Sequence, residues 1–176
     1  LWKCPKKVII STINLLKHFL ATPDLLINSE AYDFESFRFT LDKTPYTGTF
    51  SYPYDIIIGK QAEACFEYYL KHSHRYKLMA ANLQINGETE TIGEIDYLVF
   101  DIEAQQMLHI ELACKFYLYD SSLNEPAINK WIGPNRKDTL KEKLDKLYFN
   151  QFPLIRRAET QVILEKLNID SDTIVQ

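Results

Sequence analysis

Two stretches of alternating apolar and polar residues, at 93–101 and 107–119, constrain the fold of this chain most strongly. In the second stretch, the residues that alternate with the apolar ones include His109, Glu111 and Lys115. A period of two residues is typical of β-strands, because successive side chains point to opposite faces of a sheet. Each stretch therefore predicts a strand with one core face and one face that carries polar chemistry.

The short polar segment at 101–106 predicts a hairpin between these two strands. If its turn is centred between Glu103 and Ala104, Asp96 lies directly across from Glu111. Two like charges in that relation have Cβ atoms about 5 Å apart and destabilise a sheet. A divalent cation shared by the two carboxylates would turn that cost into a binding site. We therefore expect a metal site at Asp96 and Glu111.

The composition favours one globular domain, residues 1–176. The chain is 46% hydrophobic and 13% aromatic, which suits a sizeable core. The formal net charge of -4 and a pI of about 5.6 argue against a surface coated in positive charge for non-specific nucleic-acid binding, but a local basic patch stays open. Three cysteines without metal-ligand spacing favour a reducing cytoplasm and no zinc site. Because no apolar run approaches the length of a membrane span, we expect a cytoplasmic protein that is not integral to a membrane.

Apolar residues at helical spacing predict four helices. They cover residues 8–22, about 60–74, about 136–151 and 157–167. Asn135 is placed to cap the third helix, because its side chain can accept a hydrogen bond from a free backbone N–H of the first turn. Residues 24–58 lack a long periodicity and predict irregular structure, with 37–41 and 56–59 as candidates for short strands.

A further strand is predicted at 77–85, before the two alternating stretches. Asn86-Gly87 follows it and is a strong signal for a two-residue hairpin. The three strands then form an antiparallel meander that runs to Tyr119. Nothing after the last helix is expected to be long enough for a strand. The predicted class is α/β (α+β), in the order helix, meander and helices.

Charged stripes on two of the predicted helices have an ordinary structural interpretation. Glu63 and Glu67 lie opposite the apolar stripe of the helix at 60–74, and Glu67 is spaced to pair with Lys71. The residues alone favour a solvated face for both acids. The outer edge of the third helix is interpreted in the same way, and it comprises Lys137, Lys141, Glu142, Lys143, Asp145 and Lys146.

Six segments carry a resemblance to known proteins, and they are GKQAEACFEYYL, ANLQI, GEIDYLVF, HIELACKFYL, WIGPN and NQFPL. Over residues 14–154 the chain is similar to a bacterial family catalogued as domain of unknown function 1853, which has been grouped with the PD-(D/E)XK nuclease superfamily. The order of helix, three antiparallel strands and helix, with acids on the first helix and the last two strands, resembles the core of that superfamily. The resemblance implies a mixed sheet flanked by helices, with its core at 59–154.

The resemblance also implies an activity, the metal-dependent hydrolysis of phosphodiester bonds in DNA or RNA. A magnesium or manganese ion would be held by Asp96, Glu111 and a main-chain carbonyl near Leu112. This ion would polarise a phosphate oxygen and lower the pKa of an attacking water. The remaining catalytic roles fall by position on Glu63, Lys115 and Gln151. Of these, Lys115 would stabilise the charge that develops in the transition state.

The sequence departs from the superfamily pattern at two points. The lysine usually follows the acid by two residues, where this chain has Ala113, and Lys115 is about 13 Å along the strand from Glu111 at roughly 3.3 Å per residue. Because Ala113 leaves space between them, we expect Lys115 to lean back into the cleft. The superfamily core also usually adds a strand after the second helix, which this chain is not expected to have.

These departures keep two alternatives open. In the structural alternative, Lys115 or Lys77 neutralises the two carboxylates and no metal is involved. In the functional alternative, a catalytically inactive nuclease-fold module binds nucleic acid or a protein partner, which the acidic pI favours. His109 shares the acid face, and we expect it to be a flanking polar residue. The oligomeric state stays open, and so does the extent of the native chain, because the first residue is Leu1 and not Met.

Overall fold

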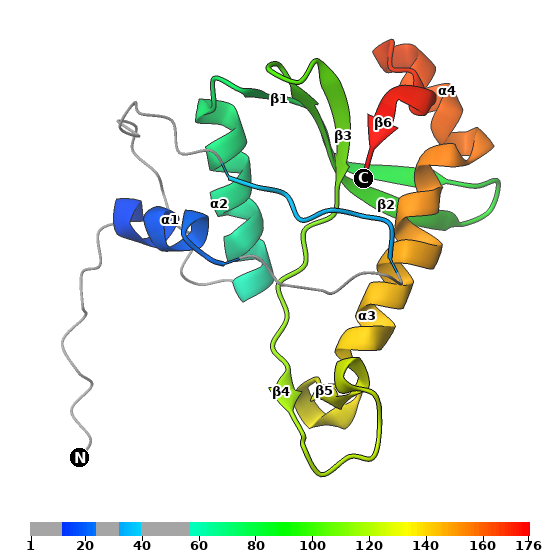
Figure 1. The fold of residues 1–176 in the computed structure, drawn as a ribbon. Coiled ribbons are helices and arrows are strands. Elements are labelled where there is room, and N and C mark those ends of the chain that lie inside the picture. The colour runs from blue at the N-terminus through cyan, green and yellow to red at the C-terminus, as the bar shows by residue number, and fades with distance from the viewer. Residues whose placement is uncertain (1–11, 24–31, 40–56) are drawn as a thin grey trace, which may run out of the picture.

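The computed structural model describes residues 12–23, 32–39 and 57–176, and a four-stranded mixed sheet lies at its centre (Figure 1). The strands are β1 (Tyr76–Asn86), β2 (Thr91–Asp101), β3 (Gln106–Ile110) and β6 (Ile174–Val175), in the spatial order β1-β2-β3-β6. The first three form the predicted antiparallel meander, and β6 pairs with β3 in parallel. The prediction that no strand follows the last helix is therefore wrong. With only two residues, β6 is too short to show a period of its own.

Helices cover both faces of this sheet (Figure 1). They are α1 (Thr12–Leu20), α2 (Ile58–His72), α3 (Leu140–Lys146) and α4 (Ala158–Leu167), and a π-helical turn (Leu147–Gln151) and a 3-10 turn (Phe152–Arg156) continue α3. Helices α1 and α2 pack on the face that carries Tyr97 and Val99. The 3-10 turn and α4 pack on the other face, which carries Leu98 and Met107. The fold is thus a mixed α+β arrangement in which the sheet is flanked by helices.

Because both faces are covered, β3 has no solvated face. Met107 and His109, which the alternation assigns to the polar side, are 8% and 2% exposed. Sheets with helices on both sides bury both sets of side chains. The polar residues of β3 therefore need partners inside the protein.

The hairpin between β2 and β3 has the predicted register. Tyr97 pairs with Ile110, and the next residues outward are Asp96 and Glu111. Asp101 anchors the turn. A turn of fixed length thus brings the two acids to the open end of the hairpin.

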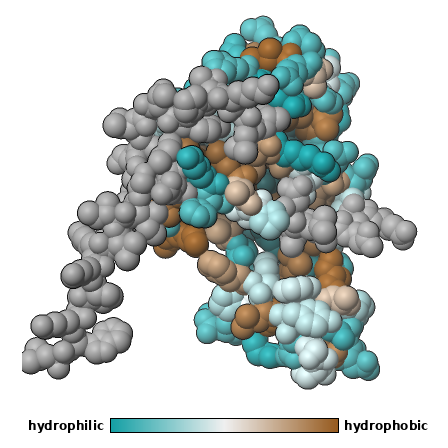
Figure 2. Space-filling view, turned by 60° about the vertical axis from the view of Figure 1, so that its left-hand side comes forward, coloured by the Kyte–Doolittle hydropathy of each residue, from teal (hydrophilic) through white to brown (hydrophobic). Residues whose placement is uncertain are grey.

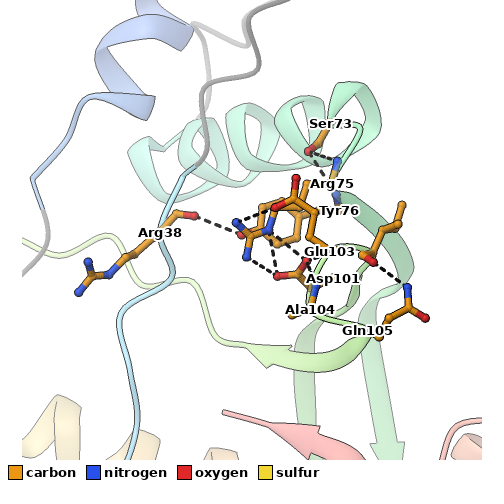
Figure 3. A network of polar contacts seen from close by, with 9 residues as sticks. Arg38, Ser73, Arg75, Tyr76, Asp101, Glu103, Ala104 and Gln105 are labelled. Atoms are coloured by element: carbon orange, nitrogen blue, oxygen red, sulfur yellow. Dashed lines mark hydrogen bonds and ion pairs between the residues drawn. The ribbon is translucent and has the colours of Figure 1, made fainter.

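Asp101 fixes the closed end of the hairpin (Figure 3). Its carboxylate accepts hydrogen bonds from the backbone N–H groups of Glu103 and Ala104 at 3.0 and 3.1 Å, and from the Arg75 guanidinium at 2.6 to 3.0 Å. The Arg75 guanidinium also lies over the Tyr76 ring, 5.1 Å from its centroid. The hydrogen bonds from Arg75 are the main reason that the pKa of Asp101 is lowered. This acid is fully partnered and serves the structure.

The strand predicted to reach Tyr119 instead ends at Ile110. Residues 111–117 are irregular, and the chain then forms a separate two-stranded sheet from β4 (Leu118–Tyr119) and β5 (Trp131–Ile132). In this region Phe116 and Leu118 are 63% and 81% exposed, so the alternation does not mark a buried face here. At the lower end of the molecule, Figure 2 shows hydrophobic residues (brown) beside hydrophilic ones (teal) on the surface.

Other boundaries differ locally from the prediction. Gly87–Glu90 forms the loop after β1, closed by a hydrogen bond from the Gly87 N–H to the Glu90 carbonyl at 2.8 Å, so this hairpin is longer than two residues. The residues at 37–39 form no strand, and Ile58 begins α2, so the candidate strand at 56–59 is wrong within the described part. Residues 8–11, 40–41 and 56 of the predicted elements lie outside the described residues. None of the described helices has the length and apolar character that crossing a membrane requires.

Candidate metal centre

Asp96 and Glu111 lie side by side where β2 and β3 separate. Oε1 of Glu111 is 3.3 Å from the Asp96 backbone N–H, which donates to it. Oδ2 of Asp96 accepts a hydrogen bond from the Leu112 backbone N–H at 2.9 Å. A backbone N–H of β2 thus holds Glu111, and a backbone N–H just beyond β3 holds Asp96, and the two acids are brought together as the register predicts.

The environment of Asp96 disfavours its negative charge. Burial, and then the charge of Glu111, raise the pKa of Asp96 to about 6, while the hydrogen bond from Leu112 opposes this shift. The more distant charges of Glu94 and Glu63 act in the same direction as Glu111. In contrast to Asp101, Asp96 has no arginine partner among the described residues. The site therefore concentrates negative charge that a cation would stabilise.

The backbone of β1 is irregular next to Asp96. Ala81 pairs with Tyr97 and Leu83 with Ile95, so Asn82 lies across from Asp96, and its φ is 51°. A positive φ is unfavourable for most residues, and asparagine is among the few that tolerate it. The pairing of β1 with β2 nevertheless continues in register on both sides of Asn82.

His109 is part of the site, although the sequence predicts only a flanking role. Its Nε2 lies 2.9 Å from Oε1 of Glu111. The amide nitrogen of Gln176 donates to the Phe152 carbonyl at 2.7 Å and lies 3.4 Å from Nδ1 of His109. Since that nitrogen can only donate, Nδ1 accepts, and Nε2 carries the proton that is donated to Glu111. This hydrogen bond fixes the orientation of the Glu111 carboxylate.

Lys143 of α3 interacts electrostatically with Glu111 and Asp96, and the sequence interpretation missed this lysine. Its side chain is half-buried and forms no ion pair with the described residues. Burial lowers the pKa of Lys143, and the charges of Glu111 and Asp96 partly offset that shift. The missed signal is its spacing: Leu140 and Leu147, at i-3 and i+4, place Lys143 on the inner side of the helix.

Helix α3 begins later than predicted. Thr139, and not Asn135, is its N-cap, and Thr139 and Glu142 form a reciprocal capping box. The Thr139 side chain accepts from the Glu142 N–H at 3.1 Å, and the Glu142 carboxylate accepts from the Thr139 N–H at 2.8 Å. Asn135 instead lies in a preceding turn with a φ of 58°.

Lys115 does not reach the carboxylates, so the expectation that it leans into the cleft is wrong. Its Nζ donates to Oδ2 of Asp138 at 2.9 Å, and its side chain is 47% exposed. The reason is that β3 ends at Ile110 and the following segment leaves the sheet. Lys77 is exposed and lies across from Phe100, away from Asp96. Neither lysine of the ion-pair alternative neutralises the site.

The remaining predicted residues lie at its margin. Glu63 of α2 pairs with Lys60 at 2.5 Å, and its charge is the weakest of the influences named above on Asp96. Glu67 forms the predicted pair with Lys71 at 3.0 Å. Gln151 is half-buried in the π-helical turn, and within the described residues no hydrogen bond joins its side chain to either carboxylate.

The donor set suits a magnesium or manganese ion. Oδ1 of Asp96 and Oε2 of Glu111 accept no hydrogen bond from the described residues, so one oxygen of each carboxylate is available. Mg2+ is commonly bound by one or two carboxylates, with water and substrate phosphate oxygens as the other ligands. In the part of the chain that the structure describes, no group of three or more His, Cys, Asp and Glu side chains is placed to hold a metal. A closed site made only of protein ligands is therefore not formed there.

Comparison with known proteins identifies a family for the chain. The family described as "Domain of unknown function (DUF1853)" matches residues 16–176, a region that includes the whole sheet and the paired carboxylates. Neither the curated proteins nor the solved structures contain a significant match. The extent of the family match shows that the chain belongs to the DUF1853 family.

Proposed function

We propose that this protein is a metal-dependent phosphodiesterase that hydrolyses nucleic acid, with Asp96 and Glu111 holding Mg2+ or Mn2+. The carrying observation is the pair of adjacent carboxylates in which burial and the Glu111 charge raise the pKa of Asp96 to about 6. An acid that serves only the structure is expected to be neutralised, as Asp101 is by Arg75. A divalent cation would supply the charge that the Asp96 site lacks.

The topology supports the same proposal. A helix, an antiparallel meander, further helices and a strand parallel to β3 follow one another in the chain. This is the order that the resemblance to the PD-(D/E)XK superfamily implies, and it includes the last strand that the sequence did not predict. The resemblance puts the metal ligands at Asp96 and Glu111, and the closeness of these two acids at the end of the meander supports that assignment.

Different residues of the site would bind the cation, orient its ligand and stabilise the phosphate. When bound, the cation would polarise a phosphate oxygen and acidify a water molecule. Asp96 and Glu111 bind it, and His109 keeps Glu111 in one orientation through its hydrogen bond at 2.9 Å. Lys143, whose charge interacts with those of Glu111 and Asp96, would stabilise the negative charge that develops on the phosphate. Lys115 is less suited to stabilise that charge, because its Nζ donates to Asp138.

A second candidate is a non-catalytic module that keeps this fold and binds nucleic acid or a protein. The observation in its favour is the displaced Lys115, which leaves the position usual for the superfamily lysine without one. The two candidates differ in whether a phosphodiester bond is broken.

The direct test is cleavage of fluorescently labelled single-stranded DNA, duplex DNA and RNA with Mg2+, Mn2+ or EDTA. Turnover should require the cation and fall by two or more orders of magnitude in Asp96→Asn and Glu111→Gln. Glu103→Gln is the matched control, because Glu103 is an exposed acid at the opposite end of the same hairpin. Absence of cleavage for every substrate, together with no effect of either cation on the protein, favours the binding module.

A further inference from the structure

A pocket of about 410 Å3 opens beside the turn that follows α3. Three aromatic residues, Tyr148, Phe149 and Phe152, line it together with four others, Asp33, Pro153, Arg156 and Gln176. Pockets with aromatic walls and a few polar groups are the usual form of a site for a small planar group. Nothing described above uses this pocket.

The pocket is linked to the candidate metal centre through Gln176. The amide nitrogen of Gln176 donates to the Phe152 carbonyl at 2.7 Å and lies 3.4 Å from His109, which in turn donates to Glu111. Phe152 also contacts the His109 ring, with centroids 5.3 Å apart at 82°. One wall of the pocket is therefore built from the groups that orient the metal ligand.

The aromatic part of the pocket is open to solvent. Phe149 is 64% exposed, and its ring lies 5.0 Å from that of Tyr148 at an angle of 83°. Exposed rings of this kind are used to stack nucleobases, because every base offers a π face. Oε1 of Gln176 accepts no hydrogen bond from the described residues, so it can accept one from the amino group of a base.

Two arginines near the rings can bind a nucleic-acid backbone, and Asp33 is the one acidic residue among the described residues that line the pocket. Arg156 and Arg157 are adjacent and exposed. Arg156 forms an ion pair with Asp172 at 2.6 Å, in which the two side chains are 54% and 84% exposed, and such a pair is weak enough to be exchanged for phosphate. These two charges would contribute little to the binding of an apolar peptide.

We propose that this pocket binds one unpaired nucleobase of a single-stranded nucleic acid, next to the phosphate that is held at Asp96 and Glu111. The inference rests on the proposed function and names its substrate class. A base inside a duplex is stacked on its neighbours and cannot enter such a pocket without being flipped out. The pocket therefore selects single strands or unpaired ends.

Binding is tested by fluorescence anisotropy with a labelled single-stranded oligodeoxynucleotide in EDTA, so that no cleavage occurs. An oligomer of the same length without bases and a duplex are the comparison ligands. The parent protein should prefer the single strand to both. Phe149→Ala should weaken single-strand binding about tenfold, the effect typical of losing one stacked base, and leave the abasic oligomer unaffected. Phe149→Trp keeps a stacking surface and should bind like the parent.

Phe116→Ala is the matched control, because Phe116 is 63% exposed but lies near β4, outside the pocket. Unchanged binding in Phe149→Ala, equal losses for the normal and abasic oligomers, or no preference of the parent for the single strand would overturn the pocket assignment. Asp96→Asn should retain base binding in EDTA. Base binding without metal-dependent cleavage would reject the proposed activity alone, and cleavage with an unaffected Phe149→Ala protein would reject the pocket alone.

Discussion

Nε2 of His109 lies 2.9 Å from Oε1 of Glu111, and the side chains of the two residues are 0% and 3% exposed. A hydrogen bond in such surroundings is costly to remove, because the group left behind keeps its desolvation penalty. The contact also limits Glu111 to one orientation, with Oε2 turned away from the histidine. His109 is thus a positioning residue for the candidate metal ligand.

Replacing His109 should therefore affect both stability and metal affinity. We expect His109→Ala to lower the free energy of unfolding by about 2 to 4 kcal/mol, from a cavity and an unpaired carboxylate. Loss of a partner that orients a metal ligand typically lowers affinity by about 10- to 100-fold. Urea denaturation and Mn2+ titration measure the two effects. His109→Gln, which retains an N–H donor, should recover part of the affinity, and equal affinities in parent and His109→Ala would rule out the positioning role.

The stability of the metal-free protein should depend on pH through Asp96. Its pKa is about 6 in the folded protein against a usual value of 3.8, so the folded state binds this proton more tightly. The contribution is fully present below pH 3.8 and is lost as the pH rises through 6. We expect a loss of about 1 to 2 kcal/mol, because solvent screening reduces the effect at a half-buried group.

The variant Asp96→Asn isolates this effect from the other acids. Without metal it should be at least as stable as the parent at pH 7, and the difference between the two proteins should vanish toward pH 4. Urea unfolding in EDTA at several pH values gives the comparison. A variant that is less stable than the parent at pH 7 would mean that a cationic side chain already pairs with Asp96.

Divalent cations should stabilise the folded parent. A ligand that binds only the folded state at one hundred times its dissociation constant contributes about 2.7 kcal/mol. Mg2+ or Mn2+ should therefore raise the melting temperature of the parent and have little effect on Asp96→Asn or Glu111→Gln. Glu103→Gln should respond as the parent does. A parent whose melting curve is the same with EDTA and with either cation argues against the metal centre.

The register of the hairpin shows what could be predicted from the sequence. The separation of Asp96 and Glu111 along the chain fixes their pairing once the turn is centred, so a local feature was sufficient. The partners of the site come from distant segments and leave no such signal. His109 is buried by the turns after α3, and β6 is a strand only because β3 offers it an edge. Local alternation carries no information on either contact.

The two lysines show a different limit. Lys115 was assigned by counting along a strand, but β3 stops where its pairing with β2 and β6 ends. Lys143 was assigned to a solvated edge, because a run of charged residues on a helix usually faces solvent. The capping box at Thr139 and Glu142 was visible in the sequence as the pattern Thr-x-x-Glu. That part of the site could have been predicted from the residues alone.

The structure therefore predicts different outcomes for these lysines. If cleavage is found, Lys143→Ala should lower turnover by about 100- to 1,000-fold, the usual cost of losing one contact to developing charge. Lys115→Ala should retain most activity, since its partner is Asp138. Lys166→Ala, an exposed lysine of α4, controls for the loss of one positive charge. Steady-state cleavage rates of the variants give the comparison. A larger loss of turnover in Lys115→Ala than in Lys143→Ala would show that Lys115, and not Lys143, stabilises the developing charge.

In the described part of the chain, β1 is an edge of the sheet and has eleven residues. A long, regular edge is a template on which a second copy of a protein can add a strand. The left-handed backbone at Asn82 and the register shift between Leu78 and Ala80 distort this edge, and the exposed Lys77 and Gln84 place polar groups along it. We therefore expect the distortion across from Asp96 to disfavour pairing of this edge with a second copy. A substitution that straightens β1 at Asn82 should promote aggregation even where it leaves the two carboxylates in place.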